Sequence, residues 1–138
     1  MPLLETGARF AARRMPKVIN PSAHAVLDYA IAGTFLIMGA RLWRRNRRAA
    51  VGSLICGGAA ALNAMVTDYP GGVTPLMDYR THGRIDATVA AMTASAPKLL
   101  GFSDEVEARF FSFQALAETV VTGLTDYEYY EDEAADND

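Results

Sequence analysis

Residues 49–67 read AAVGSLICGGAAALNAMVT and contain no Asp, Glu, Lys or Arg over 19 positions. A helix needs roughly 20 mostly apolar residues to cross the ~30 Å hydrocarbon core of a bilayer, and this stretch meets that length. Its many Ala, Gly and Ser residues would make a poor helix in water, because each Gly costs up to about 1 kcal/mol relative to Ala. In lipid the same small residues let neighbouring helices approach closely. The stretch therefore predicts a membrane-spanning helix.

Three further stretches are nearly free of charge. Residues 25–40 contain only Asp28, residues 87–102 contain only Lys98, and residues 110–125 contain only Glu118. With residues 49–67 they predict an all-α protein with four transmembrane helices. A soluble four-helix bundle is one alternative, but its helices should each carry a polar stripe, which residues 49–67 lack. A chain with fewer spans is the other alternative.

The charge distribution excludes several classes of protein. The 138 residues carry 13 basic and 16 acidic side chains, a net charge of −3, and seven of the acids lie in the last 13 residues. The first 125 residues therefore carry 13 basic and 9 acidic groups, net +4, which is far less basic than a nucleic-acid-binding protein requires. Cys56 is the only cysteine, so an intramolecular disulfide and a multi-cysteine zinc site are excluded.

We expect three segments along the chain. The basic residues 1–17 are predicted to form an amphipathic N-terminal segment at the membrane surface. Residues 18–127 form the predicted four-helix membrane domain. Residues 128–138 form an acidic tail that is predicted to be disordered.

Two short polar motifs occur twice at a constant offset of 58 residues. The motif H-x-x-x-D covers residues 24–28 and 82–86, and the motif T-D-Y covers residues 67–69 and 125–127. Chance matches in this chain should favour Ala and Leu, so a recurrence of polar residues indicates an internal duplication.

Each predicted repeat is a helix hairpin, repeat 1 at about residues 18–69 and repeat 2 at about residues 76–127. Both hairpins insert in the same direction, as parallel repeats do. H-x-x-x-D lies at the start of the first helix and T-D-Y at the end of the second, so all four motifs face one side of the membrane. The predicted polar interfacial layer consists of His24, Asp28, Asp68, Tyr69, His82, Asp86, Asp126 and Tyr127.

Tandem units built as H-x-x-x-D, a hairpin and T-D-Y resemble the SPW-repeat family of bacterial integral membrane proteins over roughly residues 15–127. Units of that family usually carry Ser-Pro-Trp and then Gly-Phe near the end of the first helix. Residues 95–102, SAPKLLGF, keep part of this pattern with Lys98 in place of the Trp, and the first unit, MGARLWRRN, lacks the proline. The resemblance implies a multi-pass, four-helix protein of the bacterial inner (plasma) membrane and no known reaction.

His24 and His82, the only histidines, have three interpretations, the third of which is proton-linked chemistry. In the first, each imidazole hydrogen-bonds Asp28 or Asp86 and braces the helix ends. In the second, the two rings are axial ligands of a haem in a redox subunit, because imidazole is a good ligand for iron. No Cys, further His or clustered Glu completes a metal site, so we expect no metal, and the first interpretation needs no cofactor.

Glu118 is an intramembrane carboxyl in the predicted fourth span. A charged group near the bilayer centre costs about 2.5–3.5 kcal/mol on insertion scales, so this side chain should face the bundle. We expect either a protonated or hydrogen-bonded group directed toward Asn63, or an ion relay in a small proton-linked transporter.

The short loop after the first predicted span is strongly basic. It contains Arg41, Arg44, Arg45, Arg47 and Arg48. By the positive-inside rule it should be cytoplasmic, which puts both termini outside, although the basic N-terminal segment gives the opposite signal. No phosphate-binding loop, serine-hydrolase or zinc-protease motif occurs. We therefore expect a structural or accessory subunit of a membrane complex rather than an enzyme, with the lipid bilayer and other membrane subunits as partners.

Overall fold

The computed structural model describes residues 15–137, and this part of the chain is helical, with no strands. Its helices are α2 (Pro21–Leu42), α3 (Arg47–Met65), α4 (Tyr79–Leu99), α5 (Ala108–Leu124) and α6 (Tyr129–Asp136). The predicted all-α class is confirmed. Of the predicted N-terminal segment 1–17, residues 1–14 lie outside the described residues, so its amphipathic helix stays a prediction.

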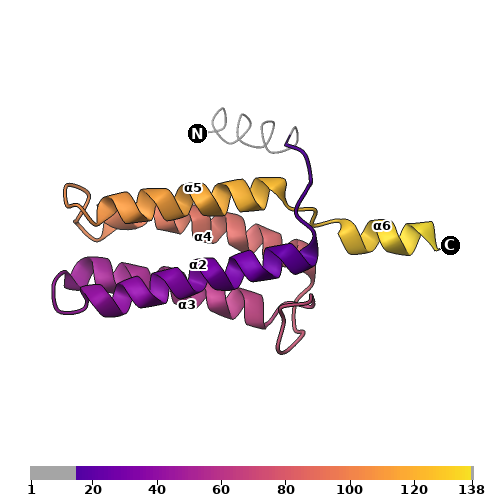
Figure 1. The fold of residues 1–138 in the computed structure, drawn as a ribbon, viewed down its shortest axis with the longest axis horizontal. Coiled ribbons are helices and arrows are strands. Elements are labelled where there is room, and N and C mark those ends of the chain that lie inside the picture. The colour runs from indigo at the N-terminus through magenta and orange to yellow at the C-terminus, as the bar shows by residue number, and fades with distance from the viewer. Residues whose placement is uncertain (1–14, 138) are drawn as a thin grey trace.

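Four long helices form one bundle (Figure 1). Helices α2 and α3 pack as one hairpin, α4 and α5 pack as a second, and α3–α4 and α2–α5 contacts join the two hairpins. Helix α6 projects from the end of the bundle at which α2 and α4 begin (Figure 1).

Polar caps fix where α2 and α4 begin. The Asn20 side chain accepts a hydrogen bond from the backbone N–H of Ala23 (2.9 Å), and Asp78 accepts one from the backbone N–H of Thr81 (2.8 Å). Such caps satisfy N–H groups that have no partner within the helix. They place His24 and His82 in the first turn of their helices, where both side chains are fully buried.

Close helix packing depends on small residues. A Cβ atom at Gly57 of α3 would lie 2.7 Å from the Cβ of Phe35 on α2, and one at Gly39 of α2 would lie 2.7 Å from the Leu54 side chain on α3. Small residues within 49–67 therefore allow α3 to approach α2 closely, as the sequence predicts. The apolar core lies beyond it, around Phe35, Phe102 and Phe111.

Between the two ends of the bundle the few charged side chains are buried, and many large apolar side chains are exposed although Phe35 and Phe111 form part of the core. Asp28 is the only charged residue of α2 before Arg41, Glu118 is the only one of α5 after Arg109, and both are buried. Ser53, Thr93 and Gln114 are buried as well. The exposed large apolar side chains of α2, α3 and α5 include Val26, Leu36, Ile37, Ile55, Leu62, Phe113, Leu116 and Val120.

Only α2 among the described helices has both the length and the composition of a membrane span, with a mean hydropathy of 1.4. The others fall short in length or in hydropathy. Helix composition by itself therefore supports one possible span, and not the four that the sequence predicts.

The acidic tail requires a correction. Residues 129–136 form α6, whereas the sequence analysis expected residues 128–138 to be disordered. Arg80 pairs with Glu128 (3.2 Å) and Glu131 (2.9 Å), which offsets part of the like-charge repulsion that predicted disorder. The ring of Tyr130 also packs on that of Tyr79, with 5.9 Å between centroids. These tertiary contacts hold the first turn of α6 against the bundle.

Candidate functional site

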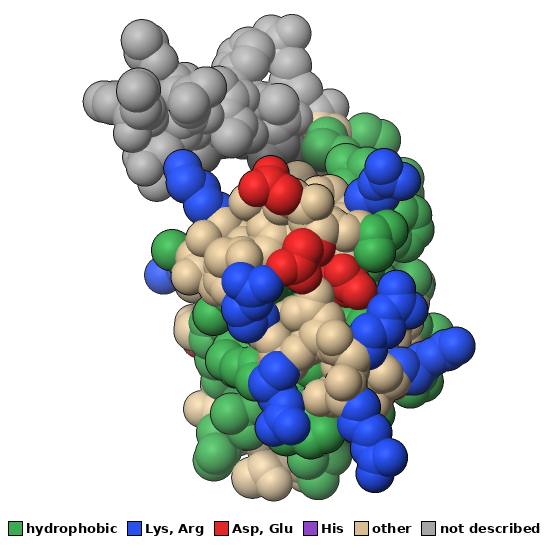
Figure 2. All heavy atoms as spheres, turned by 90° about the vertical axis from the view of Figure 1, so that its left-hand side faces the viewer, with side chains coloured by type: hydrophobic (Ala, Val, Ile, Leu, Met, Phe, Trp, Pro, Cys, Tyr) green, Lys and Arg blue, Asp and Glu red, His purple; other side chains and the backbone are tan. Residues whose placement is uncertain are grey.

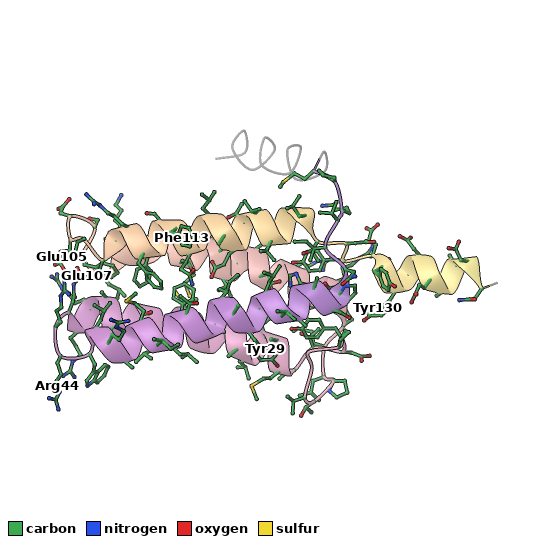
Figure 3. The ribbon with its side chains drawn as sticks, in the orientation of Figure 1. Tyr29, Arg44, Glu105, Glu107, Phe113 and Tyr130 are labelled. Atoms are coloured by element: carbon green, nitrogen blue, oxygen red, sulfur yellow. The ribbon has the colours of Figure 1, made fainter. Side chains whose placement is uncertain are left out.

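Six of the eight residues predicted for the polar layer meet at the end of the bundle where α2 and α4 begin. His24 and Asp28 come from α2, His82 and Asp86 come from α4, and Tyr69 and Tyr127 come from the segments that follow α3 and α5. We call His24, Asp28, His82 and Asp86 the His–Asp centre. Tyr130 marks this end in Figure 3, and Arg44, Glu105 and Glu107 mark the opposite end.

The four side chains of the His–Asp centre converge on one point. The two Nε2 atoms lie 3.1 Å apart. His24 Nε2 lies 3.1 Å from Asp28 Oδ1 and 3.0 Å from Asp86 Oδ2. His82 Nε2 lies 3.2 Å from Asp28 Oδ2 and 3.0 Å from Asp86 Oδ2. Each histidine thus contacts both carboxylates, whereas the sequence analysis expected one carboxylate for each.

Threonine hydroxyls hold the other nitrogen of each ring. Thr125 Oγ1 lies 2.8 Å from His24 Nδ1, and Thr67 Oγ1 lies 2.8 Å from His82 Nδ1. Each threonine therefore binds the histidine of the other hairpin, so the two hairpins are tied together across the bundle. Both threonines are buried, with 1% or less of their surface exposed.

Tyrosine hydroxyls hold the carboxylates. Tyr69 donates a hydrogen bond to Asp28 Oδ2 (2.7 Å), and Tyr127 donates one to Asp86 Oδ2 (3.0 Å). Burial raises the pKa of both phenols, and the nearby carboxylates raise the pKa further, so both phenols stay protonated and donate.

Backbone hydrogen bonds around the centre recur at the same 58-residue offset as the sequence motifs. The N–H of Asp126 donates to the carbonyl of Ile19 (3.1 Å), and the N–H of Asp68 donates to the carbonyl of Met77 (2.8 Å). The start of each hairpin is therefore joined to the end of the other. Asp68 and Asp126 therefore join the two hairpins through their backbone N–H groups.

The side chains of Asp68, Asp126 and Glu118 do not join the centre. Asp68 is exposed, and Asp126 accepts a hydrogen bond from the backbone N–H of Glu128 (3.2 Å). Glu118 accepts a hydrogen bond from Thr93 (3.3 Å), and Asn63, its expected partner, binds Asp86 instead (2.8 Å). Glu118 Oε2 is buried and has no hydrogen-bond partner.

Four residues of the site are not part of the predicted polar layer: Thr67, Thr125, Asn63 and Tyr79. The threonines were visible in the repeated T-D-Y motif, so the 58-residue offset was the signal that could have found them. Asn63 has no counterpart at the offset, where Val121 stands. The ring of Tyr79 packs on those of His24 and His82, with centroids 5.8 and 5.7 Å away, a contact that depends on tertiary structure.

The geometry does not fit a haem between the two histidines. Two axial ligands of one metal lie about 4 Å apart, twice a metal–nitrogen bond of about 2 Å, with the macrocycle between them. The 3.1 Å between the Nε2 atoms is shorter, and the carboxylates of Asp28 and Asp86 occupy the space around them. The four ligand atoms, all within 4.8 Å of one another, form instead a set that could hold a single metal ion.

A cavity of about 470 Å³ lies outside the tyrosines at this end, and Tyr69 and Tyr127 form part of its wall. Asp68, Asp78 and Glu131 line it together with one cation, Arg80. Because acids predominate, this cavity should attract cations rather than anions.

The opposite end of the bundle is basic. Figure 2 shows Lys and Arg side chains around a smaller group of acids on this face. Arg45 pairs with Glu107 (3.6 Å), and Arg48 pairs with Glu105, so the loop after α2 and the start of α3 are joined to the loop before α5. The two ends of the molecule therefore differ in charge.

No family model, no curated protein and no solved structure matches this chain. The likeness to the SPW-repeat family therefore rests on the repeated motifs alone.

Proposed function

We propose that this chain is a small, multi-pass protein of a bacterial inner membrane, in which α2–α5 span the bilayer as two tandem hairpins. In this proposal it is a structural or accessory component of a membrane complex and not an enzyme. The observation that carries it is the distribution of charge: along the middle of the four helices, the charged side chains point inward and the exposed surface is uncharged. Ionisable groups within a membrane face the bundle interior in this way.

The exposed hydroxyl groups support the same proposal. Thr34, Thr88, Ser95 and Ser112 each donate a hydrogen bond to the carbonyl four residues earlier in their own helix, at 2.7–3.2 Å. Such bonds satisfy a hydroxyl without water, as a lipid-facing helix requires.

The matched contacts around the His–Asp centre support the proposed tandem repeat and the proposed membership of the SPW-repeat family. The pairs Tyr69–Asp28 and Tyr127–Asp86 are related by the offset of 58 residues. The basic loop after α2 then belongs on the cytoplasmic side, and the His–Asp centre with both termini on the outer side.

Alkaline extraction of membranes tests the proposal. Membranes from cells that express the full chain are washed at high pH, and the protein is followed in the pellet and in the supernatant. We expect the chain to stay in the pellet and to be released by detergent. Release at high pH without detergent would contradict the membrane-spanning arrangement.

A variant pair sharpens this test. Leu116→Lys introduces a charge on the exposed face in the middle of α5, and Ser103→Lys introduces one in the exposed loop before α5. A lysine at mid-span costs about 2.5–3.5 kcal/mol on insertion scales, so Leu116→Lys should reduce the amount in the membrane and Ser103→Lys should not. Equal membrane levels for the two variants would contradict a lipid-facing α5.

Proton-linked transport is the second candidate, and the buried carboxyl of Glu118 favours it. A small cavity of about 20 Å³ is lined by Glu118 and by His24, Asp28 and Asp86. If this cavity carries protons, Glu118→Gln should abolish proton uptake into liposomes while the fold persists. The same uptake for liposomes with the wild type, with the variant and without protein would contradict this candidate.

A further inference from the structure

The His–Asp centre contains more than a pair of braced histidines. Among the described residues it is a set of two imidazoles and two carboxylates whose ligand atoms lie within 4.8 Å of one another. We propose that it binds one divalent transition-metal cation of the zinc class, which holds the two hairpins together. This proposal goes beyond the proposed function and does not depend on the membrane.

The distances fit tetrahedral coordination. Four ligands at about 2.0–2.1 Å from a central zinc ion lie about 3.3 Å from one another. The two Nε2 atoms lie 3.1 Å from each other and 3.0–3.2 Å from the nearest carboxylate oxygens, which are Oδ2 of Asp86 for both rings, Oδ1 of Asp28 for His24 and Oδ2 of Asp28 for His82. Hydrogen bonds alone do not require both nitrogens and both carboxylates to converge on one point.

The threonines identify which ring nitrogen is available to a metal. Thr67 lies 2.5 Å from the carbonyl of Asn63, and Thr125 lies 2.6 Å from the carbonyl of Val121. A carbonyl only accepts, so each hydroxyl donates its single hydrogen there and accepts from the histidine. Nδ1 therefore carries a proton in both rings, and both Nε2 atoms face the centre.

A cation between the two Nε2 atoms satisfies both of them, and protonation of the two rings is the alternative. If both were unprotonated without a cation, two lone pairs would face each other and two carboxylates across 3.1 Å. If both were protonated, each N–H could donate to a carboxylate oxygen 3.0–3.2 Å away, but two imidazolium rings would face each other with their Nε2 atoms 3.1 Å apart. A single metal ion accepts all four lone pairs, and its two positive charges balance Asp28 and Asp86, which would otherwise be costly to bury.

The surrounding contacts are those of a metal site. Metal-binding histidines usually donate their other N–H to a fixed partner, and the metal-binding carboxylates are themselves hydrogen-bonded. Here Thr67 and Thr125 accept from the histidines. The carboxylates of Asp28 and Asp86 accept from Tyr69 and Tyr127, and Asn63 donates to the other oxygen of Asp86.

The ligand types select the class of metal. Imidazole suits zinc, copper, iron and nickel, whereas calcium and magnesium prefer oxygen ligands alone. Four protein ligands close a tetrahedral set, which is typical of structural zinc sites rather than catalytic ones. The acidic cavity outside Tyr69 and Tyr127 would attract a cation to this end of the bundle.

Metal titration of the full chain in detergent tests this proposal. The protein is stripped with a chelator, its helix content is checked by circular dichroism, and it is titrated with Zn²⁺ or Co²⁺. We expect one metal per chain, and an intense visible absorption of tetrahedral cobalt that zinc removes. X-ray absorption of the zinc form should show two imidazole ligands. A folded wild-type chain without stoichiometric binding, or with cobalt in an octahedral environment, would overturn the proposal.

Matched variants separate the centre from its surroundings. Asp86→Asn and His82→Gln should abolish binding, and Thr67→Val should weaken it by about 10–100-fold, the usual effect of losing an outer partner. Asp68→Asn and Asp126→Asn, at the same end but outside the centre, should bind as the wild type does. Binding that survives in folded Asp86→Asn and His82→Gln would place the metal elsewhere. If variants fail to fold, the wild-type stoichiometry and ligand count decide.

Discussion

Single hydrogen bonds determine the chemistry of the His–Asp centre. Thr67 and Thr125 each have one hydrogen, which goes to the carbonyl four residues earlier, so they accept from the histidines. Tyr69 and Tyr127 keep their protons because burial raises their pKa, and they therefore donate to the carboxylates. The threonines thus accept hydrogen bonds from the histidines, and the tyrosines donate hydrogen bonds to the carboxylates.

Removing either tyrosine hydroxyl should destabilise the protein to a similar degree. Tyr69→Phe and Tyr127→Phe each leave a buried carboxylate with one donor fewer, which costs about 1–3 kcal/mol. Thermal unfolding in detergent, followed by circular dichroism, should give a lower melting temperature for both. Tyr130→Phe, whose half-exposed ring packs on Tyr79, is the control and should melt as the wild type does. If all three variants melted at the same temperature as the wild type, the hydroxyls of Tyr69 and Tyr127 would contribute nothing to stability.

The packing of α3 against α2 depends on the positions of the small residues in α3. Gly57 faces α2, where a Cβ atom would lie 2.7 Å from the Cβ of Phe35 and 3.2 Å from the carbonyl oxygen of Ala32. Gly58, the next residue, faces open space, with nothing within 4 Å of a Cβ atom. Two adjacent glycines of one helix therefore have opposite roles.

The pair Gly57→Ala and Gly58→Ala tests this contact. Alanine in a helix interior is more stable than glycine by roughly 0.5–1 kcal/mol, and Gly58→Ala should raise the melting temperature accordingly. Gly57→Ala should lower it, because neither a Cβ atom nor a backbone carbonyl on α2 can move aside easily. A higher melting temperature for both variants would mean that α2 and α3 do not pack as closely as described.

The positions of the helices could be predicted from the sequence, but the contacts between them could be predicted only partly. Uncharged stretches between basic loops and polar motifs predicted four long helices close to where α2–α5 lie, and the repeated motifs predicted that His24, Asp28, His82 and Asp86 would meet. The sharing of each carboxylate by both histidines could not be predicted, because it depends on how α2 and α4 approach one another. Helix α6 was missed for a similar reason, since its contacts with Arg80 and Tyr79 are tertiary.

The molecule as a whole has an uncharged outer surface along its middle and two different ends. One end has the His–Asp centre, α6 and an acid-lined cavity, and the other has the arginine-rich loop after α2. In the proposed membrane-spanning arrangement the middle of the bundle lies in lipid, the basic end lies in the cytoplasm and the His–Asp centre lies near the outer surface.

Reporter fusions test this orientation. Alkaline phosphatase is active only when it is exported, so a fusion after residue 138 should be active and a fusion within the loop at residue 45 should be inactive. The reverse pattern would place the His–Asp centre at the cytoplasmic surface and would contradict the orientation, while leaving the bundle itself unaffected.

A spin label at residue 113 can establish whether the uncharged outer surface of the bundle faces lipid. Phe113 is 68% exposed in the middle of α5, and the buried Cys56, the only native cysteine, is replaced by alanine so that the label reacts at one position. In liposomes, power saturation compares collisions with oxygen, which concentrates in lipid, and with a water-soluble nickel chelate. We expect collisions with oxygen to be the more frequent at residue 113, and collisions with the nickel chelate to be the more frequent at a control label on Ser103. Nickel collisions at residue 113 as frequent as those at residue 103 would contradict this expectation.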